Sequence, residues 1–233
     1  MSSRNIVAKA REVGLDMIAI TDHNMAENGT YAAMCAGSSG PVVLFGMELQ
    51  TIEEVHLLML FGDYETAMRL QEFVYGNLPP IENDPEYFGD QVVVDENDKI
   101  IRFEKRLLLN SSNIFMNDAV SWAKDHGGLV IPSHIDSPTF SIISQLGYVP
   151  GDIRFDALEI ARKERLKDVL PFVMAKGIPI VSFSDAHYLD DIGKKRITLS
   201  LREPSFPEVA RALKSYGNTV SRYSEGEEGA GQC

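Results

Sequence analysis

The sequence has few cysteines, no long apolar run and no excess of basic residues. Its two cysteines, Cys35 and Cys233, cannot define a disulfide framework, so nothing indicates an oxidising compartment. Residues 1–5 lack the apolar core of a signal peptide, and no uninterrupted apolar stretch is long enough to cross a bilayer. We therefore expect a cytoplasmic protein that is neither exported nor inserted into a membrane.

Basic residues are outnumbered, because 22 Lys and Arg stand against 34 Asp and Glu, for a formal net charge of -12. A protein that binds extended duplexes without sequence preference gains most of its affinity by neutralising phosphates with clustered Lys and Arg. The charge balance argues against such a partner. It leaves room for a small phosphorylated substrate or a short nucleic-acid end held by metal ions, although most of the acidic surplus is what a solvated surface carries.

Short apolar runs alternate with helical patterns along the 233 residues, which suffice for one sizeable core. The apolar runs are 17–20, 42–45, 55–61, 129–131, 155–160 and 178–183. Helical patterns occupy 2–13, 117–126, 163–176 and 207–216. This alternation predicts an α/β protein with a largely parallel sheet, and the length allows a TIM-like barrel.

Two segments depart from this rhythm. Residues 76–113 contain the breakers Pro79-Pro80 and Asp84-Pro85, and two apolar runs flank the turn-like residues 95–98 as in a hairpin. We expect an insertion over one barrel end, either a specificity element or a plain surface elaboration. Residues 224–233 lack apolar anchors, so a disordered tail is expected over residues 223–233, which leaves one domain over residues 1–222.

Candidate metal ligands stand just past the ends of the apolar runs. They are Asp22 with His23, then Glu48, then His134, and finally Asp185 with His187. His56 lies within its own apolar run, where an inward-pointing imidazole would reach the same centre. The carboxyl ends of parallel strands meet at one barrel mouth, so these groups should gather there.

A single histidine after a strand is more often structural than ligating, but four histidines with the two carboxylates Glu48 and Asp185 at one mouth favour a metal site. Mixed nitrogen and oxygen ligands suit zinc, manganese or iron better than calcium. The fifth histidine, His126, precedes Gly127-Gly128 at a predicted helix end and is expected to be structural.

Five short motifs carry these residues in a fixed order. They are Ile20-Thr21-Asp22-His23-Asn24, Gly46-Met47-Glu48, Glu54-Val55-His56-Leu57-Leu58, Ile131-Pro132-Ser133-His134 and Phe183-Ser184-Asp185-Ala186-His187. Their order resembles that of the PHP (polymerase and histidinol phosphatase) family, and the resemblance extends to about Tyr188. It implies a distorted (β/α)7 relative of the TIM barrel with two or three metal ions, usually zinc, manganese or iron.

The resemblance also implies roles for individual residues. Glu48 would bridge two metals, His56 and His134 would complete one position with Asp185 closing it, and His23 with His187 would serve another. Asp22 and Asp185 are the candidate catalytic carboxylates, Asp22 by orienting a ligand. The implied reaction is hydrolysis of a phosphoester by a metal-activated water.

The opening motif of that family, a strand ending in His-x-His before the first helix, is absent from this chain. An internal start at Met1 or a genuine loss of the strand would each account for this. We expect such a chain to bind fewer metal ions, to hydrolyse weakly, and to self-associate through the gap in the barrel.

Substrate contacts and alternative functions complete the expectations. Arg162 and Lys163 follow the run 155–160 and are candidates to hold a phosphate, or else a solvated pair that begins a charged helix. The alternatives to a phosphoesterase are a metal-dependent amidohydrolase-like enzyme and a non-catalytic PHP interaction module. Against the amidohydrolase, no Lys ends a mid-barrel strand as a bridging group would require.

Overall fold

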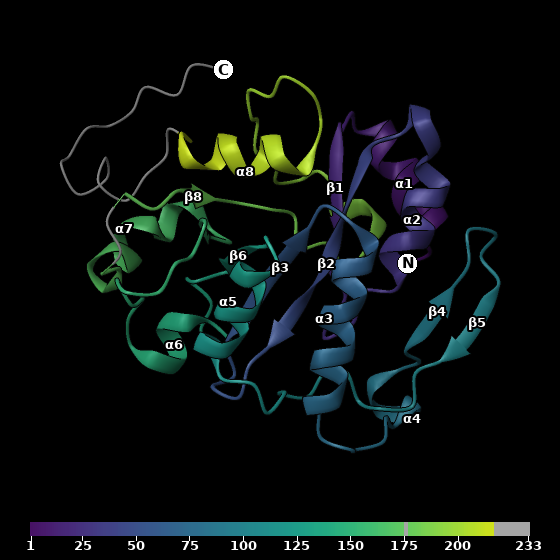
Figure 1. Cartoon of the computed structure of the whole chain (residues 1–233), viewed down its shortest axis with the longest axis horizontal. Helices are drawn as coiled ribbons and strands as arrows, with labels where there is room; N and C mark the ends of the chain where they lie inside the picture. Colours follow the sequence, from purple (N-terminus) through teal and green to yellow (C-terminus); the bar gives the residue numbers. More distant parts are fainter. Residues whose placement is uncertain (175–176, 217–233) are drawn as a thin grey trace.

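The computed structural model describes residues 1–174 and 177–216, and its centre is a mixed sheet of four strands. In spatial order these are β1 (Met17–Ile20), β2 (Val42–Gln50), β3 (His56–Phe61) and β6 (Leu129–Pro132) (Figure 1). β1 and β2 are parallel, whereas β3 is antiparallel to both β2 and β6. The protein is therefore α/β as predicted.

The expectation of a largely parallel sheet is wrong for β3. Residues 51–55 join β2 to β3 as a tight turn, closed by a 3.0 Å hydrogen bond from Thr51 N to Val55 O. A parallel crossover needs a dozen or more residues, so this short link forces the two strands to run in opposite directions. His56 consequently begins β3 and does not lie inside it.

Two short parallel strands, β7 (Leu158–Glu159) and β8 (Ile180–Val181), continue beyond β6. Hydrogen bonds from Asp156 N to Val130 O, 2.9 Å, and from Ile135 N to Glu159 O, 2.8 Å, hold β7 beside β6. The predicted runs 155–160 and 178–183 thus form strands, although shorter ones. Within residues 1–174 and 177–216 the strands form no closed barrel.

Helices cover both faces of the sheet, as the alternation of side chains along β3 requires. Met59 and Phe61 point into a core shared with α3 (Tyr64–Asn77) and α5 (Met116–Asp125). Leu60 points to the opposite face, where α8 (Phe206–Lys214) packs. Figure 1 shows α1 (Ser3–Glu12) and α2 (Asn28–Ala36) beside β1 and β2.

The helical patterns at 2–13, 117–126 and 207–216 are confirmed as α1, α5 and α8, and the Ser2 hydroxyl caps α1 by accepting a hydrogen bond from Asn5 N. The helical pattern expected over 163–176, around Pro171, is found only as short pieces within the described residues 163–174. That segment breaks into short turns at Pro171, whose nitrogen has no hydrogen to donate. The turns are η2 (Lys163–Arg165), α7 (Leu166–Val169) and η3 (Leu170–Phe172).

The insertion forms the predicted hairpin, with β4 (Val92–Val94) antiparallel to β5 (Ile100–Phe103) and α4 (Pro85–Phe88) before it. Arg102 joins the hairpin to the body by pairing with Glu27, at the start of α2, and with Glu104. The remaining elements are η1 (Gly37–Ser39), α6 (Ile142–Leu146) and η4 (Leu189–Asp191).

None of the described helices is long and apolar enough to span a membrane. The predicted tail, residues 223–233, lies outside the described residues.

The close approach of β2 and β3 at Gly46 gives a test of the sheet. A Cβ on Gly46 would lie 2.0 Å from the Met59 carbonyl oxygen, so Gly46→Ala must push the two backbones apart. We expect the free energy of unfolding in urea to fall by about 1–3 kcal/mol. The control is Gly76→Ala in α3, where a Cβ meets nothing within 4 Å. That change should be neutral or stabilising, and equal losses in both variants would contradict the strand pairing.

Candidate metal centre

The candidate ligands meet at one edge of the sheet because β3 is antiparallel. The carboxyl ends of β1, β2 and β6 lie there, and so does the start of β3. His23 follows β1 and forms an isolated bridge with Glu48, and the hydrogen bond from Glu48 N to Asp22 O is 3.1 Å. Because β3 runs antiparallel to β2, its first residue, His56, lies at the same edge as the carboxyl ends of the other strands. His56 is therefore close to the other candidate ligands, as predicted.

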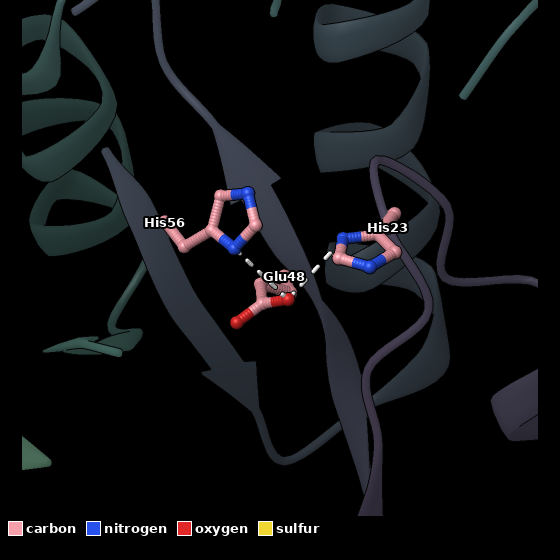
Figure 2. A group of neighbouring side chains, drawn as sticks. All are labelled: His23, Glu48 and His56. Atoms are coloured by element: carbon pink, nitrogen blue, oxygen red, sulfur yellow. Dashed lines mark ion pairs between the residues drawn. The ribbon is translucent and has the colours of Figure 1, made fainter. Parts of the chain in front are cut away.

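Glu48 is the centre of the group, and its carboxylate is buried. Oε2 lies 3.2 Å from His23 Nδ1 and 3.4 Å from His56 Nδ1, whereas Oε1 lies 3.8 Å from His134 Nε2. Figure 2 shows the His23 and His56 rings turned toward this carboxylate. The ligand atoms of His23, Glu48 and His56 all lie within 4.8 Å of one another, a spacing that one cation can span.

Three ring nitrogens of the group have no hydrogen-bond partner among the described residues. They are Nδ1 of His23, His56 and His134, all buried. Buried polar atoms are nearly always hydrogen-bonded, so unpartnered nitrogens around a carboxylate need another explanation. A divalent cation accepts lone pairs from neutral imidazoles and from a carboxylate, so this donor set fits a metal.

The charges of the group are those that a metal requires. Burial opposes ionisation of Glu48, but the imidazoles of His56 and His23 outweigh it and lower the pKa of Glu48 to about 2. Burial lowers the pKa of His23, only partly opposed by Glu48. At neutral pH the glutamate is therefore an anion and His23 a neutral imidazole.

Asp185 and His187 follow β8 and lie at the exposed rim of the group. Asp185 Oδ1 is 3.8 Å from His187 Nδ1, and their side chains are 48% and 63% exposed. The His187 ring centroid lies 6.3 Å from that of His23. These two residues thus reach the neighbourhood of the cluster without joining its tight core.

Two other sequence candidates occupy different surroundings. The Asp22 carboxylate accepts a 2.7 Å hydrogen bond from Asn28 Nδ2, at the start of α2, so its role in orienting a ligand stays a prediction. His126 stacks on Trp122 at the end of α5, with ring centroids 3.9 Å apart, as expected for a structural histidine.

A cavity of about 320 Å³ opens beside the cluster. Its lining residues are His134, Ser137, Thr139, Phe140, Ala161, Arg162 and Asp185. Arg162 therefore faces the same space as two candidate ligands, whereas Lys163 is exposed and does not line the cavity.

Asp136 fixes the chain around Arg162. Its buried carboxylate accepts hydrogen bonds from Ala161 N at 2.7 Å, from Arg162 N at 3.1 Å and from Arg162 Nε at 3.4 Å. Arg165 Nη1 donates to the Asp136 carbonyl oxygen at 2.8 Å. The guanidinium of Arg162 is thereby tethered beside the cavity.

Backbone strain concentrates around the same cavity. His134, Phe140 and Asp185 adopt positive φ values of 31°, 55° and 45°, which are costly for residues with side chains. Such outliers persist where the surrounding structure holds them, and they cluster at functional sites. Their coincidence in one cavity lining makes this edge of the sheet the candidate functional site.

Glu159 is a buried neighbour that the sequence reasoning missed. Its Oε2 accepts a 3.2 Å hydrogen bond from His134 N. Burial raises the pKa of Glu159 to about 8, and the negative charges of Asp185 and Glu48 add to this rise, against the opposing effect of that hydrogen bond. The one available signal was an acidic residue at the end of an apolar run.

The chain matches no family model, and no curated protein is similar enough in sequence to match it. Its fold is nevertheless similar to solved structures. Endonuclease Q of Pyrococcus furiosus, a lesion-specific endonuclease, superposes with a TM-score of 0.63 at 16% identity, over 94% of this chain and 52% of that one. A second endonuclease Q structure, a complex with a 27-mer duplex that contains an abasic lesion, superposes with a TM-score of 0.61 at 16% identity. The match covers 94% of this chain and 53% of that one.

A third structure, from Bifidobacterium adolescentis and provisionally described as a metal-dependent phosphoesterase, gives a TM-score of 0.56 at 16% identity. The match covers 91% of this chain and 90% of that one. The chain spans about half the length of the two endonuclease Q chains. These similarities show the fold, and they are consistent with the PHP-like fold that the motifs predict.

Replacing the central carboxylate tests the metal centre. Glu48→Gln removes the anion beside two imidazoles, so we expect the affinity for Zn²⁺ or Mn²⁺ to fall by at least about 10–100-fold, the loss typical of even an outer partner of a metal ligand. Elemental analysis after dialysis against each metal and isothermal titration calorimetry give the measurement. Glu72→Gln, an exposed glutamate on α3, is the control and should bind like the parent. Equal binding by both variants, or none by the parent, contradicts the assignment.

Proposed function

We propose that this protein is a metal-dependent phosphoester hydrolase of the PHP type. The observation that carries the proposal is a buried Glu48 carboxylate with three imidazoles around it, whose Nδ1 atoms lack hydrogen-bond partners in the described part of the chain. An arginine-lined cavity opens directly beside it. The fold likeness to a lesion endonuclease and to a metal-dependent phosphoesterase supports the same class of reaction.

Glu48, His23, His56 and His134 would hold the ion, and Asp185 with His187 at the exposed rim would complete the coordination of one or two further ions. Zinc, manganese and iron suit this mixture of nitrogen and oxygen donors. When bound, such a cation supplies Lewis-acid chemistry that polarises a phosphoryl oxygen and acidifies water. We propose a distorted, seven-stranded TIM-like barrel as the full form of the fold.

The chain's own residues define the rest of the site. Arg162 binds phosphate oxygens through its guanidinium fork, whose planar donors match that geometry. Glu48 keeps its negative charge at neutral pH and would so hold a cation among the surrounding histidines.

The substrate that fits best is a small phosphorylated metabolite, a nucleotide or a short nucleic-acid end. A cavity of about 320 Å³ accepts a group of that size, at the lower end of ordinary ligand pockets. The net charge of -12 disfavours a long duplex track. Action on lesion-containing DNA belongs to endonuclease Q, of which this chain covers about half.

The reaction is tested with the full chain and added Zn²⁺, Mn²⁺ or Fe²⁺ against p-nitrophenyl phosphate, nucleoside bisphosphates and short oligonucleotides. We expect hydrolysis of at least one phosphoester that requires the added metal and is abolished by a chelator and by Glu48→Gln. Amide hydrolysis alone would favour the amidohydrolase-like alternative. Absence of both activity and metal binding would favour the interaction module.

Arg162 and Lys163 provide a matched pair for the phosphate contact. Arg162→Met removes a charged donor from the cavity, and one hydrogen bond to a charged group is worth about 1.5–3 kcal/mol, so kcat/KM should fall roughly 10–100-fold. Lys163→Met changes a neighbour that does not line the cavity and should alter kcat/KM by less than about twofold, the range of surface changes within about 0.5 kcal/mol. A larger effect at Lys163 than at Arg162 would refute the assignment of Arg162.

A further inference from the structure

Phe140 is an exposed aromatic residue at the cavity beside the metal centre. Single exposed apolar side chains are common on protein surfaces, so its exposed fraction of 38% has no meaning by itself. Its place is the informative feature. Among the described residues that line the cavity, Phe140 is the one large apolar side chain, and His134, Arg162 and Asp185 line the same space.

The phenyl ring lies flat against a candidate metal ligand. Its plane is 4° from that of the His56 imidazole, and the two ring centroids are 4.9 Å apart. His56 is buried and does not line the cavity, whereas Phe140 does. The part of the phenyl ring that borders the cavity is therefore the part turned away from His56.

The imidazole on which Phe140 lies is held at both ring nitrogens. His56 Nδ1 lies 3.4 Å from Glu48 Oε2, and His56 Nε2 lies 3.2 Å from Oε1 of Gln50, its cross-strand partner on β2. The hydrogen bond from His56 N to Phe140 O is 2.9 Å, so the two stacked residues are also joined through the backbone. Phe140 therefore rests on a side chain that is itself held in place.

The loop that carries Phe140 is closed by its own serines. Ser137 N donates to His134 O at 2.7 Å, and Ser141 Oγ donates to Ser137 O at 2.7 Å. Ser141 also begins the capping box of α6 with Ser144. Between these anchors Phe140 has a φ of 55°, which is costly for a residue with a bulky side chain. The surrounding hydrogen bonds hold this strained residue beside the cavity.

An aromatic ring and an arginine in one cavity suit a ligand with two different parts. The planar donors of the Arg162 guanidinium match a phosphate group. A phenyl ring takes a flat ring system by stacking, and every nucleobase has a π-face that can stack in this way. A phosphate and a flat ring system on one small molecule are the chemistry of a nucleotide. A sugar phosphate without a base would leave Phe140 unused.

We propose that Phe140 is a base-binding platform and that it selects nucleotides over phosphorylated metabolites that lack a base. The use of this selection rests on the proposed function, but the selection itself is a property of binding and is measured without turnover. A free mononucleotide and the phosphorylated end of a short oligonucleotide offer the same chemistry to the cavity, so the test includes both.

The test compares two ligands that differ by the base. Adenosine 5′-monophosphate and ribose 5-phosphate are titrated into the full chain by isothermal titration calorimetry, with Mn²⁺ and again in a chelator that stops metal-dependent hydrolysis. Stacking on an aromatic side chain changes affinity by about 5–150-fold, so the nucleotide should bind more tightly by a factor in that range. A 5′-phosphorylated tetranucleotide separates the two sources, because it should bind like the mononucleotide if the cavity takes a strand end and much more weakly if it encloses a free nucleotide.

Substitutions at Phe140 separate stacking from the support of the metal centre. Phe140→Leu keeps an apolar side chain but removes the flat ring, so the ratio of nucleotide affinity to ribose 5-phosphate affinity should fall to about one. Phe140→Trp offers a larger flat ring and should keep or raise the ratio. A disturbed metal centre weakens the phosphate contact of both ligands alike, so the ratio reports on the base.

Phe172→Leu is the control, because Phe172 is 47% exposed on η3 and does not line the cavity. It should leave the ratio at the parental value. The proposal is overturned if the parent binds the two ligands equally, if it binds neither, or if Phe140→Leu keeps the parental preference. A base preference that depends on Phe140, in a chain that hydrolyses no phosphoester, would sustain the platform and refute the proposed function. Metal-dependent hydrolysis without any base preference would do the reverse.

Discussion

The structure depends on one buried anion. Isolating a carboxylate from water is costly unless charges or hydrogen bonds compensate, and Glu48 is compensated chiefly by the imidazoles around it. This requirement explains why the ends of three strands and the start of a fourth converge on one point. The strained backbone at His134 belongs to the same arrangement, because this residue presents an imidazole 3.8 Å from the Glu48 carboxylate.

The sequence was sufficient to predict what depends on local patterning. Apolar runs located every strand of the described sheets, and the breakers Pro79-Pro80 located the insertion with its hairpin. Local patterning could not predict the direction of β3, because a buried parallel strand and a buried antiparallel strand can have the same run of apolar residues. The short link 51–55 contained the missing information, since it is too short for a crossover. Pro171 likewise signalled the break in the expected helix.

Part of the site was predictable and part was not, for a physical reason. His23, Glu48, His56 and His134 belong to motifs whose chemistry is visible in the residue types, and the structure gathers them. The supporting residues Gln50, Asp136 and Glu159 are ordinary polar residues in sequence. Their partners are set by cross-strand register and by the path of loops far along the chain, which periodicity does not encode. A faint clue was their spacing, since Gln50 and Asp136 each lie two residues after a candidate ligand.

The tether between Asp136 and Arg162 has a consequence for how tightly a ligand is held. A flexible arginine loses rotamer freedom when it grips an anion, and that loss subtracts from affinity. Here the backbone at Ala161 and Arg162 is already held by a carboxylate from which water is excluded, and Arg162 Nε lies 3.4 Å from the same carboxylate. Part of the entropy is therefore lost during folding and not during association. The cavity should accordingly discriminate among anions by shape, because a receptor that does not rearrange cannot adapt to a guest of the wrong geometry.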